Sequence, residues 1–337
     1  QLLQVCKKIK DMNSGVSPII SYDGYWNFVF QIWWAQYVGI ETYNEFFRPD
    51  FDVKPSDPNS AYVLQFDGRQ SALSVLEELV KSSNGYDNKK VKSDSFTQIQ
   101  SYFLRGRSAM IPNGGWMLRE MENTQTKDVN PVIMKLPVNS DIAYKLNITE
   151  EQLIAAISYY DGDTNVKPDI SDEAYEEIKK ARGLTSSSVA YAYPCIIPSY
   201  SDAVELAKEF LVFSTTEEAM RIKIKTAGIM PFVKCDYDKT FLSDPDNASY
   251  MKNDFIKSKL DVMSSEDYNI LMMSLTSDPF YFVNNLQAFN KYNYPANILG
   301  SASTGIYRTV QQLLADEQDY METSWSMFVN AAKKYKD

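Results

Sequence analysis

The sequence places two groups of aromatic side chains beside turns, a combination suited to holding a flat, partly apolar ligand. In "IPNGGW" a Pro-Asn-Gly-Gly turn leads directly into Trp116. In "SYDGYW" an Asp-Gly turn lies between Tyr22 and the pair Tyr25–Trp26. Such rings offer apolar faces for stacking, and their N–H or O–H groups can hydrogen-bond. Aromatic residues also fill cores, so both uses remain open for Trp116 and Trp26.

The composition excludes several kinds of chemistry. The 337 residues contain no histidine, which removes Ser-His-Asp and Cys-His catalysis and imidazole ligation of zinc. The formal net charge is -10, and no basic stripe offsets the acidic residues, so nucleic acid is not an expected partner. No motif indicates a cofactor.

Three cysteines, Cys6, Cys195 and Cys235, are too few for a disulfide scaffold or a thiolate metal site. Free buried thiols are the simpler expectation. A bond between Cys195 and Cys235, which lie in one segment, is left open.

An acidic stretch, "DGDTNVKPDISD", has part of the spacing of a calcium-binding loop. The candidate ligands, at loop positions one, three, five, nine and twelve, are Asp161, Asp163, Asn165, Asp169 and Asp172. Val166 stands at the sixth position where that loop needs glycine, and Pro168 is a further misfit. The pattern therefore favours a solvated acidic turn over a calcium site.

Hydrophobic periodicity predicts an α/β chain. Trp26, Phe30, Trp33 and Tyr37 recur at helical spacing, and "GRQSALSVLEELVKSS" predicts a second helix. The stretch "DSFTQIQSYFLRGRSAMIPNGGWMLREM" predicts a helix to Leu104, a short strand "SAMI", a turn and a new helix led by Trp116.

Further helices are predicted over residues 141 to 183, with Thr149 and Ser171 as caps. A strand in "SSSVAYAY" and a helix pair in "DAVELAKEFLVFSTTEEAMRIKIK" follow. Acidic turns with short helices are expected over 236 to 296, and two helices close the chain.

Four blocks, in order, resemble a known family. "SGVSPIISYDGYWNFVFQIW", "FLRGRSAMIPNGGW", "AVELAKEFLVFSTTEEAMRIKIKTAGIMPFVK" and "YRTVQQLLADEQDYMETSWSMFVNAAKKY" are similar to successive segments of the extracellular solute-binding proteins that serve ABC importers, the group that includes maltose-binding protein. Together the blocks cover most of the chain.

The resemblance implies an α/β, periplasmic-binding-protein-like fold of type II, with two lobes joined by a hinge around a ligand cleft. The start of the family's N-terminal lobe has no counterpart, so the chain is expected to be N-terminally incomplete. Residues 1–183 would form most of the C-terminal lobe, with a helical acidic insertion at 141–183. Residues 184–290 would return to the N-terminal lobe, and 291–337 would supply closing helices.

The same resemblance implies an extracytoplasmic substrate-binding subunit, periplasmic or a cell-surface lipoprotein, that captures a sugar or oligosaccharide and presents it to a permease. Any membrane contact would come through a lipid anchor outside this chain, and no enzymatic activity is expected. The implied ligand-binding residues are Trp116, Tyr25, Trp26, Asn113, Gly115, Tyr22, Asp23, Tyr307, Ser186 and Ser187.

Two other readings use the same aromatic residues. A glycoside hydrolase would need a pair of carboxylates, for which Asp23 is the one acid beside the predicted site. A tyrosine-rich adhesion module would instead present the rings to a protein partner.

Overall fold

The computed structural model describes residues 1–47, 52–60, 63, 66–88, 95–124, 129–189, 195–227, 233, 253–273 and 309–336. Tyr307 and Cys235 lie outside these ranges, as does most of the predicted segment 236–296. No helix in the described ranges is both long and apolar enough to cross a membrane.

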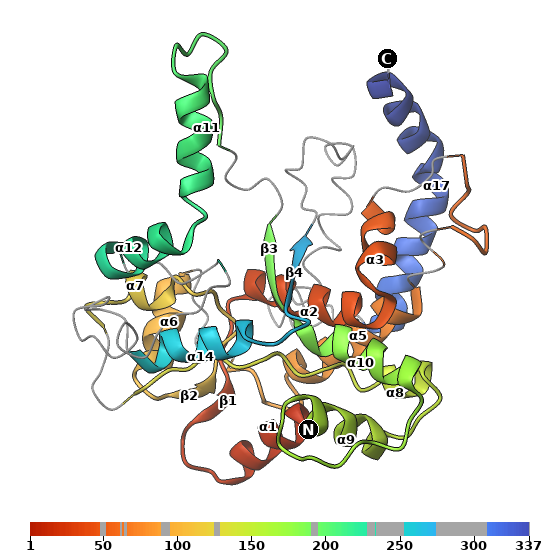
Figure 1. Ribbon diagram of the computed structural model, residues 1–337. Coiled ribbons are helices and arrows are strands. Elements are labelled where there is room, and N and C mark those ends of the chain that lie inside the picture. The colour runs from red at the N-terminus through yellow and green to blue at the C-terminus, as the bar shows by residue number, and fades with distance from the viewer. Residues whose placement is uncertain are drawn as a thin grey trace.

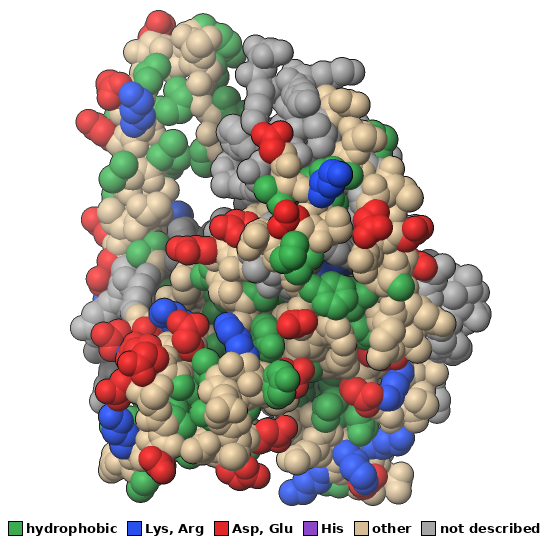
Figure 2. Space-filling model, turned by 90° about the vertical axis from the view of Figure 1, so that its right-hand side faces the viewer, with side chains coloured by type: hydrophobic (Ala, Val, Ile, Leu, Met, Phe, Trp, Pro, Cys, Tyr) green, Lys and Arg blue, Asp and Glu red, His purple; other side chains and the backbone are tan. Residues whose placement is uncertain are grey.

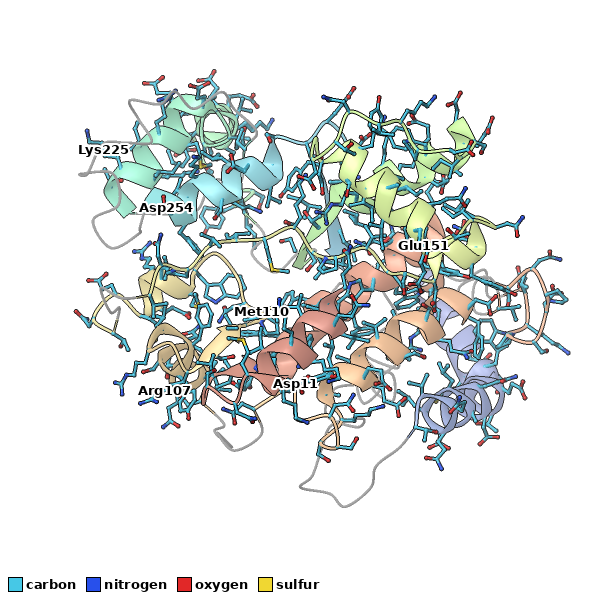
Figure 3. The ribbon with its side chains drawn as sticks, turned by 90° about the horizontal axis from the view of Figure 1, so that it is seen from below. Asp11, Arg107, Met110, Glu151, Lys225 and Asp254 are labelled. Carbon is cyan, nitrogen blue, oxygen red and sulfur yellow. The ribbon has the colours of Figure 1, made fainter. Side chains whose placement is uncertain are left out.

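A small parallel sheet joins β1 (Ser17–Ile19) to β2 (Ser108–Met110), with Ser17 opposite Ser108 and Ile19 opposite Met110. Residues 86–88 also pair with β1, through a parallel bridge between Ile19 and Asp87. Helix α1 (Leu2–Asp11) packs on β1, and α6 (Phe96–Leu104) leads into β2 as predicted. In Figure 3, Met110 lies toward the interior beside α2, whereas Arg107, before the strand, lies at the outer margin.

Helix α2 (Asp23–Val38) is the centre of the main core, and its predicted helical spacing is confirmed. Phe30, Trp33 and Trp34 are fully buried against the apolar stripe of α5 (Phe66–Val80). The chain then turns at Gly39 into α3 (Ile40–Phe47). Each large buried aromatic side chain contributes roughly 1.5–3 kcal/mol, so this helix is a major source of stability.

The C-terminal segment differs from its prediction. Instead of two helices, one continuous helix, α17 (Val310–Lys336), packs its first turns against α5 and extends past it (Figure 1). The prediction was wrong because this stretch contains neither glycine nor proline, so no residue interrupts the helix.

A second parallel sheet pairs β3 (Leu184–Val189) with β4 (Asn269–Met273) beside α2. Helix α14 (Asn253–Met263) precedes β4. The side chain of Gln36 in α2 donates a hydrogen bond to the backbone oxygen of Leu184 over 3.0 Å. This buried bond fixes the start of β3 on the central helix.

The helix pair α11 (Val204–Phe213) and α12 (Glu217–Ala227) is present as predicted. Helix α12 contributes Met220 and Ile224 to a second core, which also contains residues of α6, α14 and α7 (Met117–Glu120). Helix α11 buries none of its residues and projects from the body in Figure 1. Acidic side chains are spread over the face seen in Figure 2, with basic ones between them.

The helical segment 141–183 contains α8 (Ile142–Lys145), α9 (Glu150–Tyr160) and α10 (Asp172–Gly183). Both predicted caps are confirmed. Thr149 forms a capping box with Gln152, and Ser171 accepts a hydrogen bond from the backbone of Ala174.

Asp161, the first residue of the acidic stretch, is held by two cations. Its carboxylate lies 2.6 Å from Nη2 of Arg182 and 2.7 Å from Nζ of Lys135. Asp172 pairs separately with Lys167. Across the described ranges there is no group of three or more His, Cys, Asp or Glu side chains that could hold a metal ion. Asp161 thus links α10, through Arg182, to the segment that contains Lys135.

We expect Asp161→Asn to destabilise the fold by about 3 kcal/mol, because it leaves two partly buried cations without a counter-charge. Burial alone would raise the pKa of Asp161, but the hydrogen bonds and charges of Arg182 and Lys135 outweigh it and lower the pKa. The carboxylate therefore stabilises the fold above its unfolded pKa of about 4, and this contribution is lost as pH falls through the lowered folded pKa.

Urea unfolding at several pH values measures this contribution. The matched control is Asp163→Asn, at an exposed position in the same turn. The assigned ion pair would be contradicted if both variants had the same free energy of unfolding. It would also be contradicted if the stability of Asp161→Asn fell at low pH by as much as that of the unmodified protein.

The two described cysteines should differ in reactivity. Cys6 is fully buried, and burial raises the pKa of its thiol to about 11 against a smaller opposing effect of a backbone hydrogen bond. Cys195 is a free, exposed thiol. In native protein, iodoacetamide should alkylate Cys195 quickly and Cys6 only after unfolding. Peptide mass spectrometry would read this out, and equal labelling rates would contradict the burial of Cys6.

Candidate functional site

Three of the predicted aromatic residues, Tyr22, Tyr25 and Trp116, meet at one edge of the β1–β2 sheet. Because the strands are parallel, the segments that follow them leave the sheet at the same edge. Tyr22 follows β1 and Tyr25 lies in the first turn of α2, whereas Trp116 follows β2 as the N-cap of α7. Open α/β sheets commonly bind ligands outside the carboxyl ends of their strands.

Tyr25 contacts both Tyr22 and Trp116 edge to face, and these three residues are here called the aromatic group. The ring centroids of Tyr25 and Trp116 are 6.1 Å apart at 71°, and those of Tyr22 and Tyr25 are 5.3 Å apart at 69°. Phe28 and Phe96 extend the group on either side. Trp116 is 45% exposed, so it does not anchor the core, and part of its ring is open to a ligand.

Gly114 lies under the Trp116 ring. A Cβ atom at residue 114 would come within 2.0 Å of Cζ3 of Trp116, so no other residue fits without moving the ring. Gly114 does not have a positive φ, so space and not backbone conformation requires glycine. Sequence reasoning had selected Gly115. The sequence shows two glycines before Trp116, but it does not show which of the two lies under the ring.

Asn113, also predicted, shapes this turn. Its Oδ1 accepts a hydrogen bond from the backbone N–H of Gly114 over 2.7 Å. Its Nδ2 is buried and makes no hydrogen bond with the described residues.

Trp26 is a correction to the predicted site. It is only 3% exposed, and its Nε1 donates to Oγ of Ser21 over 2.7 Å on the core side of α2. Neighbouring residues on a helix point about 100° apart, so Tyr25 and Trp26 cannot both face the same surface. The structure leaves Tyr25 partly exposed and buries Trp26 in the core.

Of the remaining predicted residues, Ser186 and Ser187 lie in β3. Ser187 in β3 donates to the backbone oxygen of Phe28 over 3.1 Å, which connects it to the aromatic group only through α2. Ser186 accepts a hydrogen bond from Nζ of Lys259 over 3.2 Å. The side chain of Asp23 lies outside the described residues, as does Tyr307.

Glu120 is a neighbour of the aromatic group that sequence reasoning missed. Burial is the main cause that raises the pKa of the Tyr25 hydroxyl; a hydrogen bond from Trp116 opposes the rise, and the negative charge of Glu120 adds to it. Gln100 in α6 is fully buried and donates from Nε2 to the Glu120 carboxylate over 2.9 Å. The available signal was the spacing of Glu120, four residues after Trp116.

The comparisons with known proteins identify the family of the chain. A family model described as "Bacterial extracellular solute-binding protein" matches residues 1–221. The chain belongs to this family, whose members bind solutes outside the cytoplasm as components of ABC transporters and are not enzymes. No curated protein and no solved structure matches the chain.

The family match confirms the resemblance to extracellular solute-binding proteins. It covers the first two sequence blocks and part of the third, and it does not reach the fourth. It supports a periplasmic-binding-like fold, in keeping with the mixed helices and parallel sheets of the structure. The two-lobe division, the sugar ligand and the individual site residues stay predictions.

We expect Gly114→Ala to push the Trp116 ring away from Tyr25, at a cost of about 1 kcal/mol for overpacking beside a side chain that can still move outward. The near-ultraviolet circular dichroism of the edge-to-face pair should weaken. In a Trp116→Ala background the same substitution should cost nothing, because the crowding atoms are gone. Equal costs in both backgrounds would contradict the close approach.

Proposed function

We propose that this chain is the extracytoplasmic substrate-binding subunit of an ABC importer and that it binds a sugar or oligosaccharide on the aromatic group. The half-exposed ring of Trp116, held beside Tyr25 at the carboxyl edge of the parallel strands, carries this proposal. Pyranose rings have apolar C–H faces that stack on aromatic side chains, and their hydroxyl groups need polar partners.

The surroundings of the aromatic group supply those polar partners. The Tyr25 hydroxyl, the Glu120 carboxylate and the buried Nδ2 of Asn113 lie on or next to the same turns. A carboxylate accepts hydrogen bonds from sugar hydroxyls, and an amide N–H donates to them. The site thus combines a stacking surface with both kinds of hydrogen-bonding group.

Transport follows from differential binding. A ligand that contacts two lobes makes more contacts in the closed state and shifts the population toward it. The permease would then recognise the closed, loaded form. In this mechanism the side chains position and hold the solute, and none has to act as a catalyst.

Substitution of Trp116 by alanine should weaken oligosaccharide binding tenfold or more, equivalent to about 1.4 kcal/mol, because the stacking surface is lost. Isothermal titration calorimetry against a panel of oligosaccharides, with tryptophan fluorescence in parallel, measures this. Tyr144→Ala is the matched control, since Tyr144 is a strongly exposed aromatic residue on α8, outside the aromatic group.

The absence of binding heat and of any change in tryptophan fluorescence across the whole panel would overturn the carbohydrate assignment. Equal loss of binding in both variants would remove the aromatic group as its location. Release of reducing sugar during the titration would favour the hydrolase alternative, and Asp23→Asn would then identify its carboxylate.

A further inference from the structure

Glu120 has a charge that no basic side chain among the described residues neutralises. It is exposed at the end of α7, and its carboxylate accepts a hydrogen bond from Gln100. No ion pair to Glu120 occurs within the described part of the chain, although ten other ion pairs with acidic residues do. A carboxylate next to a ligand surface and without a counter-ion favours a ligand that brings positive charge.

The carboxylate is also fixed in position. Gln100 is fully buried and can approach a carboxylate only with its NH₂ group, so the direction of this hydrogen bond is determined. The backbone N–H of Glu120 bonds to the oxygen of Trp116 over 3.1 Å, which is the helical spacing that puts residues i and i+4 on one face. Glu120 therefore lies beside Trp116.

The aromatic group adds a second attraction for cations. Ring faces carry partial negative charge, and an ammonium group within about 6 Å of a ring centroid is attracted to it. Tyr25 is near enough to Glu120 for that charge to raise the pKa of its hydroxyl. Rings and carboxylate thus attract positive charge to the same place.

We propose that Glu120 makes this site selective for saccharides that carry a protonated amine, with the sugar ring stacked on Trp116 and the ammonium group against Glu120. This inference rests on the proposed function, because it assigns the class of sugar that the same site prefers. Gln100 is a positioning residue that holds the carboxylate toward the rings.

The test compares β-1,4-linked glucosamine trisaccharide with its N-acetylated form and with the matching glucose trisaccharide, by calorimetry at mildly acidic pH. There the amine is protonated. The amine form should bind roughly five- to tenfold more tightly than either neutral sugar, the amount expected from one exposed charge pair and one cation–ring contact.

Glu120→Gln should remove this preference, because it should weaken binding of the amine form roughly five- to tenfold more than binding of the neutral sugars. The amide keeps the size of the side chain and one acceptor oxygen, so both kinds of sugar lose the same hydrogen bonds, but only the amine form loses the charge pair. Glu122→Gln, at an exposed position just beyond α7, is the matched control and should keep the preference.

The outcomes separate the two proposals. Binding of neutral sugars with no preference for the amine form, or a preference that survives in Glu120→Gln, would overturn the role of Glu120 and leave the carbohydrate site intact. Failure of all three sugars to bind would contradict both proposals. Spermidine binding as tightly as the amine sugar, with the same dependence on Glu120, would show that the site selects charge without a sugar ring and would overturn the amine-saccharide assignment.

Discussion

The parallel pairing of β1 with β2 is the constraint on which the site depends. Each strand has only three residues, yet their common direction brings the end of a segment near residue 20 next to one near residue 111. In an antiparallel pair these two ends would lie at opposite edges of the sheet. Tyr25 and Trp116 can touch only because both strands finish at the same edge.

Helix α2 connects this edge to the core. Its first turn presents Tyr25, whereas Phe30, Trp33 and Trp34 further along are buried against α5. The packing of these three side chains holds α2, and with it the partly exposed ring of Tyr25, in position, since a well-packed core resists displacement. Hydrogen bonds made by the side chains of Gln36 and Ser187 connect α2 to β3, so the second sheet is joined to the helix that contains Tyr25.

The turn before α7 shows how backbone and side chains cooperate in the site. Glycine at residue 114 allows the Trp116 ring to lie directly over the chain, and Asn113 closes the turn with its own side chain. One helical turn later, the Gln100 amide holds the Glu120 carboxylate. Together these contacts place a half-exposed ring next to a carboxylate, and the proposed ligand site consists of these groups.

The sequence by itself determined the local elements. Periodicity gave α2, α5 and the helix–strand–turn unit around Trp116, while short-range hydrogen bonds of Thr149 and Ser171 were foreseeable because caps act within four residues. The family was recognisable from four ordered blocks. Only the tertiary structure decided that Trp26 is buried while Tyr25 is partly exposed, that Gly114 lies under the ring, and that Gln100 holds Glu120. The physical reason is that the burial of each side chain depends on which segment, distant in sequence, packs against it. A local sequence pattern contains no information about that distant segment.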